Sequence, residues 1–131
     1  MAIESDINGA LSEFALIPAV NLLVAAGTQT YAGVDVKDYI GEIKLVFTHA
    51  GAAADGSNSL QVSILDSADN TTFAASAGLP TFAAITATSG TVSVGLDTRA
   101  CKRYVQGKLL TSSTTATFRS ACVGVGLKQV I

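Results

Sequence analysis

The chain has 131 residues, a formal net charge of −2, and only 14% charged residues. This length fits one domain, and the charge argues against general nucleic-acid binding, which needs a strong positive balance. Small and β-branched residues with little charge favour an all-β sandwich whose surface is partly covered by something else. A soluble protein with a weakly charged surface is the alternative.

The charges are unevenly distributed. Residues 1–36 contain four acids and no Lys or Arg, whereas residues 97–131 contain six bases and one acid. One end of the chain could therefore recognise a surface of opposite sign or another copy of itself. The segment Met1–Asp6 is acidic, unlike a signal peptide, and the apolar run Phe14–Ala26 is too short to span a bilayer. We expect a soluble protein made in a cytoplasm, with no membrane partner.

Residues 1–12 show no convincing period and are predicted to be an N-terminal arm, followed by one β-sandwich domain over residues 13–131. Alternation is clearest in Ile40–Thr48, where Ile43, Leu45 and Phe47 should face inward. A second strand is Leu60–Leu65, with Leu60, Val62 and Ile64 on one face. The other extended runs are Val20–Ala25, Thr28–Tyr31, Thr72–Ala75, Thr81–Ala87, Thr91–Leu96, Arg103–Leu110 and Ala116–Leu127.

Turn signals separate these runs, at Gly27-Thr28, at Asp66–Thr71 and at Thr111–Thr115. About eight strands without a sustained helical period predict an antiparallel β-sandwich or barrel. The last two strands are predicted to form a hairpin about Ser112–Thr115.

That hairpin would place Cys122 opposite Tyr104 and leave Cys101 about three residues out of register. Both cysteines are therefore expected to be free, partly buried thiols.

No pattern of residues predicts catalysis. His49 is the only histidine; it follows a strand, is expected to be solvated, and has no evident nucleophile as a partner. The Asp66, Asp69 and Asn70 group resembles a calcium cluster but lacks EF-hand spacing, so a side-chain-capped turn is favoured. Gly124 and Gly126 would permit a bulge or the close approach of a neighbouring backbone. We expect no enzyme activity, no cofactor and no metal.

The segment Leu96–Leu110 holds half of the basic residues. Its cations are Arg99, Lys102, Arg103 and Lys108. A nucleic-acid site would need more cations and interleaved aromatic residues, so two other interpretations are favoured equally. The cations keep an edge strand soluble, or they contact an acidic partner surface. Asp97 and Arg99 are expected to fix the turn that enters this segment.

Several motifs in order resemble small structural proteins of tailed-phage virions. They are a Leu-x-Val-x-Ile run at Leu60–Ile64, the turn Asp66–Phe73, the run Phe82–Ala87, Val94–Arg99, and Lys102–Val105. The resemblance covers about residues 20–127, and such proteins are similar to capsid decoration, or cement, proteins with a jelly-roll sandwich. It implies a non-enzymatic virion protein that binds the outside of an icosahedral capsid and bridges capsomers.

On this basis we expect the major capsid protein as partner and a homo-oligomer, either a dimer or a trimer. The arm, with Glu4 and Asp6, would dock on the capsid protein or a sister copy. The four cations of Leu96–Leu110 would supply complementary charge. The alternative function is a carbohydrate- or receptor-binding sandwich of a phage fibre, spike or tail. Such sites usually display exposed aromatic platforms, and this chain has no Trp.

Overall fold

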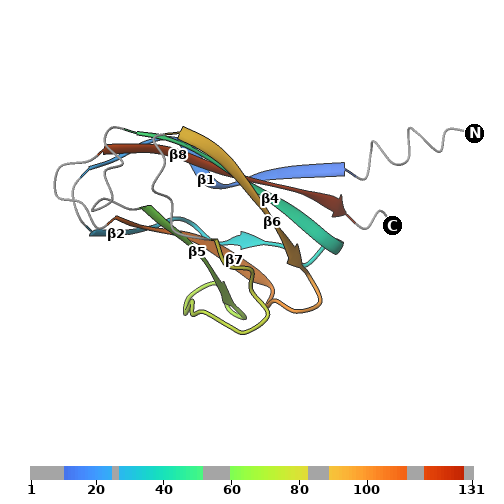
Figure 1. The fold of residues 1–131 in the computed structure, drawn as a ribbon. Helices are drawn as coiled ribbons and strands as arrows, with labels where there is room; N and C mark the ends of the chain where they lie inside the picture. Colours follow the sequence, from blue (N-terminus) through green and yellow to red (C-terminus); the bar gives the residue numbers. More distant parts are fainter. Residues whose placement is uncertain (1–10, 25–26, 52–59, 83–88, 112–116, 129–131) are drawn as a thin grey trace, which may run out of the picture.

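The computed structural model describes residues 11–24, 27–51, 60–82, 89–111 and 117–128, which form two antiparallel sheets packed face to face (Figure 1). Sheet A has the order β1-β8-β4-β6, and sheet B has β7 at its centre, with β2 and β3 along one side and β5 along the other. The strands of sheet A are β1 (Leu11–Val24), β4 (Tyr39–Gly51), β6 (Ser89–Asp97) and β8 (Thr117–Lys128). Those of sheet B are β2 (Gly27–Thr30), β3 (Val34–Asp35), β5 (Leu60–Ser67) and β7 (Tyr104–Thr111).

The strand pairs are nested along the chain, which defines a jelly roll. β1 pairs with β8, β2 and β3 pair with β7, and β4 pairs with β6. Inside these pairs lies β5, which pairs with β7 and also forms an isolated bridge from Asp66 to Ala74. A long antiparallel ribbon folded over on itself gives this nesting and distributes its strands between two sheets. The predicted antiparallel β-sandwich of jelly-roll type, with about eight strands, is confirmed.

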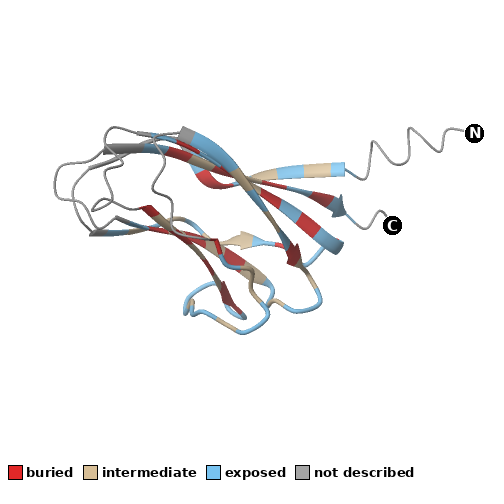
Figure 2. Ribbon diagram, in the orientation of Figure 1, coloured by how far each residue is buried: buried red, intermediate tan, exposed pale blue. Residues whose placement is uncertain are grey.

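The core fills the space between the sheets (Figure 2). Ile43, Leu45 and Phe47 of β4 are fully buried, as predicted from their alternation. The inward residues of β5 are buried as well, and its burial pattern alternates over most of the strand. The two sheets thus contribute alternate side chains to one apolar cluster, whose burial is the main stabilising term of the fold.

The predicted hairpin of the last two strands is wrong. β7 lies in sheet B, whereas β8 lies in sheet A between β1 and β4. Cys122 therefore lies opposite Ile17 and Phe47, and not opposite Tyr104. Alternation fixes which face of a strand is buried, but it does not fix the neighbouring strand, and in a nested ribbon the successive strands β7 and β8 separate.

The turn predicted at Gly27-Thr28 is also wrong, because both residues lie in β2 and pair with β7. The runs predicted around Phe73 and Phe82 form no strand within residues 72–82, apart from the bridge at Ala74. Residues 83–87 of the second run lie outside the described residues. β1 begins at Leu11, and residues 1–10 of the predicted arm likewise lie outside them.

A side-chain-capped turn follows β5, as expected. The Asp69 carboxylate accepts hydrogen bonds from the Thr71 and Thr72 amides, at 3.0 and 3.1 Å, and from the Ser67 hydroxyl at 2.8 Å. These donors, the Thr72 amide first, lower the pKa of Asp69 to about 2. Asn70 completes the turn with a φ of 59°, a conformation that Asn tolerates better than most residues.

Candidate interaction surface

The predicted charged turn lies between β6 and β7, and Asp97 closes it. The Asp97 carboxylate accepts the Arg99 amide at 2.9 Å, and the Asp97 carbonyl accepts the Ala100 amide at 3.0 Å. The Arg99 guanidinium also contacts the same carboxylate, at 3.3 Å. The Arg99 amide, followed by its guanidinium, lowers the pKa of Asp97. The expectation that Asp97 and Arg99 fix this turn is confirmed.

The turn is also tied to the start of β4. The amide and the hydroxyl of Thr98 both donate to the Gly41 carbonyl, at 3.0 and 2.6 Å. Gly41 has a φ of +73°, which glycine adopts without steric cost. A register shift between Ile40 and Lys44 accompanies this residue, so β4 bends at the position where the turn is anchored.

Arg103 is engaged within the chain. Its guanidinium donates to both carboxylate oxygens of Asp35, at 2.9 to 3.2 Å, and lies 5.0 Å from the centre of the Tyr104 ring. The hydrogen bonds from Arg103 lower the pKa of Asp35. Because Asp35 belongs to β3 and pairs in register with Tyr104 of β7, this ion pair joins the two strands at the surface.

The remaining predicted contact residues are dispersed. Lys102 has an exposed side chain next to the turn, whereas Lys108 is half-buried on β7, between Thr30 of β2 and Ser63 of β5. Five residues of extended chain separate Lys108 from Arg103, about 17 Å. Glu4 and Asp6 lie outside the described residues.

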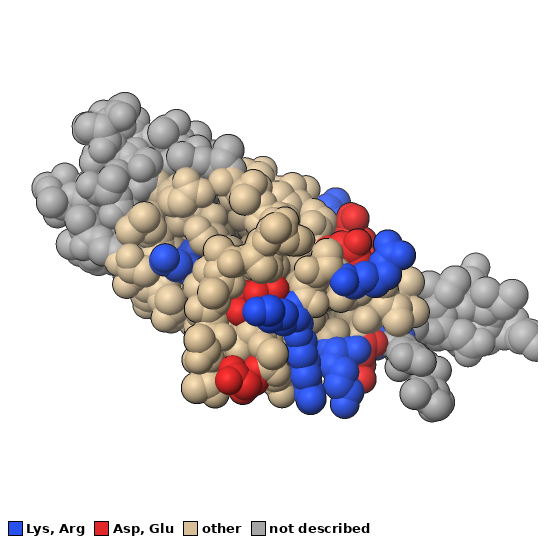
Figure 3. Space-filling view, turned by 90° about the horizontal axis from the view of Figure 1, so that it is seen from below, with Lys and Arg blue, Asp and Glu red and all other residues tan. Residues whose placement is uncertain are grey.

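The cations thus share one segment but not one compact patch. Seen from below, most described charges gather toward one end of the molecule, with both signs interleaved (Figure 3). Arg99 and Arg103 each have an acidic partner within the chain. Lys102 is left as the exposed cation of the turn that has no ion pair among the described residues.

An exposed apolar face accompanies these charges and was not predicted. Leu11, Ile40, Val125 and Leu127 are 49, 50, 37 and 41% exposed, and all four lie on the outer surface of sheet A. We call these four residues the apolar face. Leu11 lies opposite Leu127, and Leu127 lies opposite Ile40, so three of its side chains form a row across β1, β8 and β4.

Glycines inside β8 explain why this face was missed. In the run from Val123 to Leu127 the large residues alternate with Gly124 and Gly126, which would normally place the large residues in the core. The structure reverses this orientation. A Cβ on Gly124 would overlap the ring of Phe14, and one on Gly126 would lie 2.9 Å from the Tyr39 ring. Aromatic rings from β1 and β4 occupy the space, and the valines and Leu127 face outward.

The other candidates of the sequence form no site. His49 was expected to be solvated but is only 7% exposed, because the inward alternation of β4 continues one step beyond Phe47. Its ring stacks on Phe47 with centroids 5.9 Å apart, and burial lowers its pKa. Cys101 and Cys122 are free thiols, partly and fully buried, as expected. Burial raises the pKa of Cys122 to about 12.

Within the part of the chain that the structure describes, no three His, Cys, Asp or Glu residues are grouped so that they could hold a metal ion. Of the three tyrosines and five phenylalanines, all but Phe118 have described side chains, and each of these is buried or half-buried. None of them forms an exposed aromatic platform. The described residues also contain no helix that is long and apolar enough to cross a membrane.

Comparison with known proteins finds similar folds but no related sequence. No protein-family model and no curated protein sequence matches the chain. Among solved structures, the chain is similar to the VP2 subviral particle protein of infectious bursal disease virus, with a TM-score of 0.55 and 10% identity over 89% of this chain. The chain spans only 32% of that protein.

A second structure is the C-terminal CBM6 of the laminarinase LamC from Zobellia galactanivorans, with a TM-score of 0.45 and 11% identity. The match covers 86% of this chain and 98% of that one. The likeness to VP2, at 10% identity, concerns the β-sandwich fold alone.

Proposed function

We propose that the protein is a non-enzymatic structural component of a phage virion that binds the outside of an icosahedral capsid and stabilises the joints between capsomers. The observation that carries the proposal is the hydrogen-bonded turn after β6, which exposes Lys102, a cation with no ion pair among the described residues, next to an exposed apolar face. Large apolar patches at a protein surface mark sites of contact with other proteins. The jelly-roll fold and the resemblance of the sequence motifs to decoration proteins support a capsid as the setting.

In the proposed mechanism, the protein holds neighbouring capsomers together by direct contacts. The hydrogen-bonded turn presents Lys102 and Arg99 to acidic positions of the major capsid protein, and the acidic segment with Glu4 and Asp6 docks beside it. Each contact needs little free energy, because a symmetric shell repeats it many times and multivalent attachment is far tighter than its single contacts. A sandwich that does not deform then transmits load from one capsomer to the next.

Binding to capsids tests this function directly. Purified protein is added to capsids assembled without it; we expect it to co-sediment with them to saturation and to raise the temperature at which they release DNA. The variant Lys102→Glu should weaken binding several-fold. A matched control is Arg119→Glu, which makes the same charge change on β8 at an exposed position far along the strand from Leu127.

Absence of co-sedimentation, together with an unchanged release temperature, would exclude the capsid role. Equal losses in the two variants would show that the turn is not the contact. Binding of the protein to glycans in place of capsids would favour the carbohydrate-binding alternative, for which the described residues offer no exposed aromatic ring.

A further inference from the structure

The outer surface of sheet A arranges its side chains in level rows across three strands. Leu11, Leu127 and Ile40 form the first row, through the pairing of β1 with β8 and of β8 with β4. The same register places Glu13, Val125 and Lys44 in the second row, and Ala15, Val123 and Val46 in the third. β8 is the central strand, so each row has an apolar centre with one side chain on either side.

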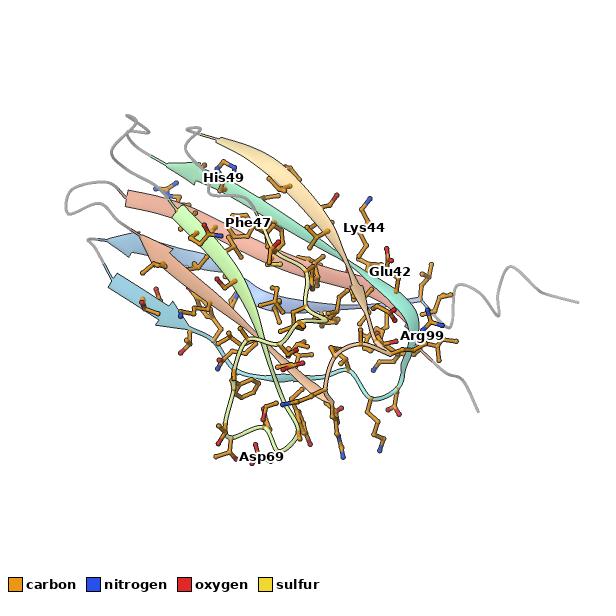
Figure 4. All side chains as sticks on the ribbon, turned by 60° about the horizontal axis from the view of Figure 1, so that its bottom comes forward. Glu42, Lys44, Phe47, His49, Asp69 and Arg99 are labelled. Atoms are coloured by element: carbon orange, nitrogen blue, oxygen red, sulfur yellow. The ribbon has the colours of Figure 1, made fainter. Side chains whose placement is uncertain are left out.

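The second row carries opposite charges at its two ends. Glu13 on β1 and Lys44 on β4 are both exposed, and Lys44 points away from the core (Figure 4). They are two strand spacings apart, about 10 Å, which is too far for an ion pair within one chain. Among the described residues, neither of them has an ion-pair partner.

From these rows we infer that a second copy of the chain binds face to face on this surface, about a two-fold axis that runs along β8. Such an axis places β1 of one copy over β4 of the other, and each row faces the same row of the second copy. Glu13 then faces Lys44 of the second copy, and the symmetry repeats this ion pair. Leu11 faces Ile40 of the second copy, and Val125 and Leu127 each face their own counterparts.

The charges select this axis over the other one that the plane of the sheet allows. A two-fold axis perpendicular to the strands, passing through the second row, would place β1 over β1 and β4 over β4. Glu13 would then face Glu13, and Lys44 would face Lys44, and such like-charge contacts are destabilising. The surface at a two-fold interface must be complementary to itself, and the rows meet that condition about the axis along β8, where each charge faces its opposite.

Packing of this kind is already used inside the molecule. Two sheets stack about 10 Å apart, with strand directions within about 30° of each other. A crossing displaces the rows that lie far from its centre along the strands, so a crossing centred on the second row keeps the two ion pairs best. The contact would also cover the apolar face, whose four large side chains are 37 to 50% exposed.

Charge reversal provides the sharpest test, because it needs no capsid. Sedimentation velocity of the wild-type chain should show a dimer that dissociates on dilution. Glu13→Lys and Lys44→Glu, made separately, should each raise the dissociation constant at least tenfold. The double variant E13K/K44E exchanges the two charges across the interface and should recover most of the affinity.

A pair of matched leucines separates the interface from general surface hydrophobicity. Leu127→Asp should give monomers, whereas Leu110→Asp should leave the dimer intact, since Leu110 is 43% exposed on sheet B, nearly the same as Leu127 at 41%. Circular dichroism checks that each variant is folded. A monomeric wild type, a dimer that survives L127D, or a double variant no better than the single ones would each overturn the inference. These outcomes concern the chain alone, so they leave the capsid proposal to its own test.

Discussion

Asp66 acts as the junction of three segments. Its carboxylate is 1% exposed and accepts the Ser76 hydroxyl at 2.9 Å and the Lys102 amide at 3.0 Å. Its backbone forms the bridge to Ala74. One side chain therefore fixes the end of β5, the loop after it, and the segment that enters β7.

Replacing Asp66 should loosen all three segments. Asp66→Ala leaves the Lys102 amide and the Ser76 hydroxyl, both partly buried, without their acceptor, so we expect the free energy of unfolding to fall by about 2–3 kcal/mol. Ser76→Ala removes only one of the two hydrogen bonds and should cost about 1 kcal/mol. Urea denaturation of the two variants measures both changes. Equal values for the two variants would contradict the role of the Lys102 amide.

His49 should make stability depend on pH. Burial lowers the pKa of His49 below the ordinary histidine value of 6.5, so the folded state favours the neutral ring. The part of the free energy of unfolding that depends on a neutral His49 is therefore present above about pH 6.5. It decreases as the pH falls toward the pKa of His49 in the folded state. The urea midpoint should be lower at pH 5.5 than at pH 7.5, and the difference should shrink in His49→Gln. An unchanged difference in this variant would assign the effect to other groups.

At the scale of elements, the sequence predicts which face of a strand is buried better than which strand lies beside it. The strands around Phe47 and Val62 were predicted with their buried faces, because large apolar residues recur there at every second position. The strand partners of β7 were predicted wrongly, and so was the turn at Gly27, which lies in a strand. Nested strand pairs depend on the whole chain and not on local sequence. The apolar face was missed because Gly124 and Gly126 face the core and are covered by rings from other strands. The charged turn was predicted, because Asp97 and Arg99 interact locally.

Gly107 sets the distance between the two sheets at the centre of β7. A Cβ at this position would lie 2.6 Å from Cγ1 of Ile17, which reaches across from β1 of sheet A. Gly107→Ala should therefore reduce the free energy of unfolding by about 1–3 kcal/mol through overpacking. In an Ile17→Ala background the same substitution should cost much less, because the space is then available. A double-mutant cycle by chemical denaturation measures this coupling, and additive losses would argue against the contact.

At the scale of the molecule, two kinds of surface lie at the same end. The turn after β6 is hydrogen-bonded to Gly41, and Ile40, its neighbour in β4, belongs to the apolar face. The charges that follow the turn nevertheless lie on the other sheet. The apolar face covers the outer side of sheet A, whereas the Arg103–Asp35 pair lies on sheet B. A dimer formed through sheet A would leave two copies of the charged turn available, and each could hold a different subunit of a shell.

The pairing of β1 with β8 also determines when the molecule can finish folding. β1 is synthesised before β8, which is its neighbour among the described strands of sheet A, so the edge of that sheet stays incomplete until β8 has left the ribosome. Pairing across so long a loop is slow, and we expect refolding to take milliseconds to seconds, as in other proteins dominated by non-local contacts. A chain that stops before Thr117 should remain sensitive to protease, whereas the full chain resists it. Protection of that shorter chain would show that sheet A forms without β8, so biosynthesis would not have to wait for it.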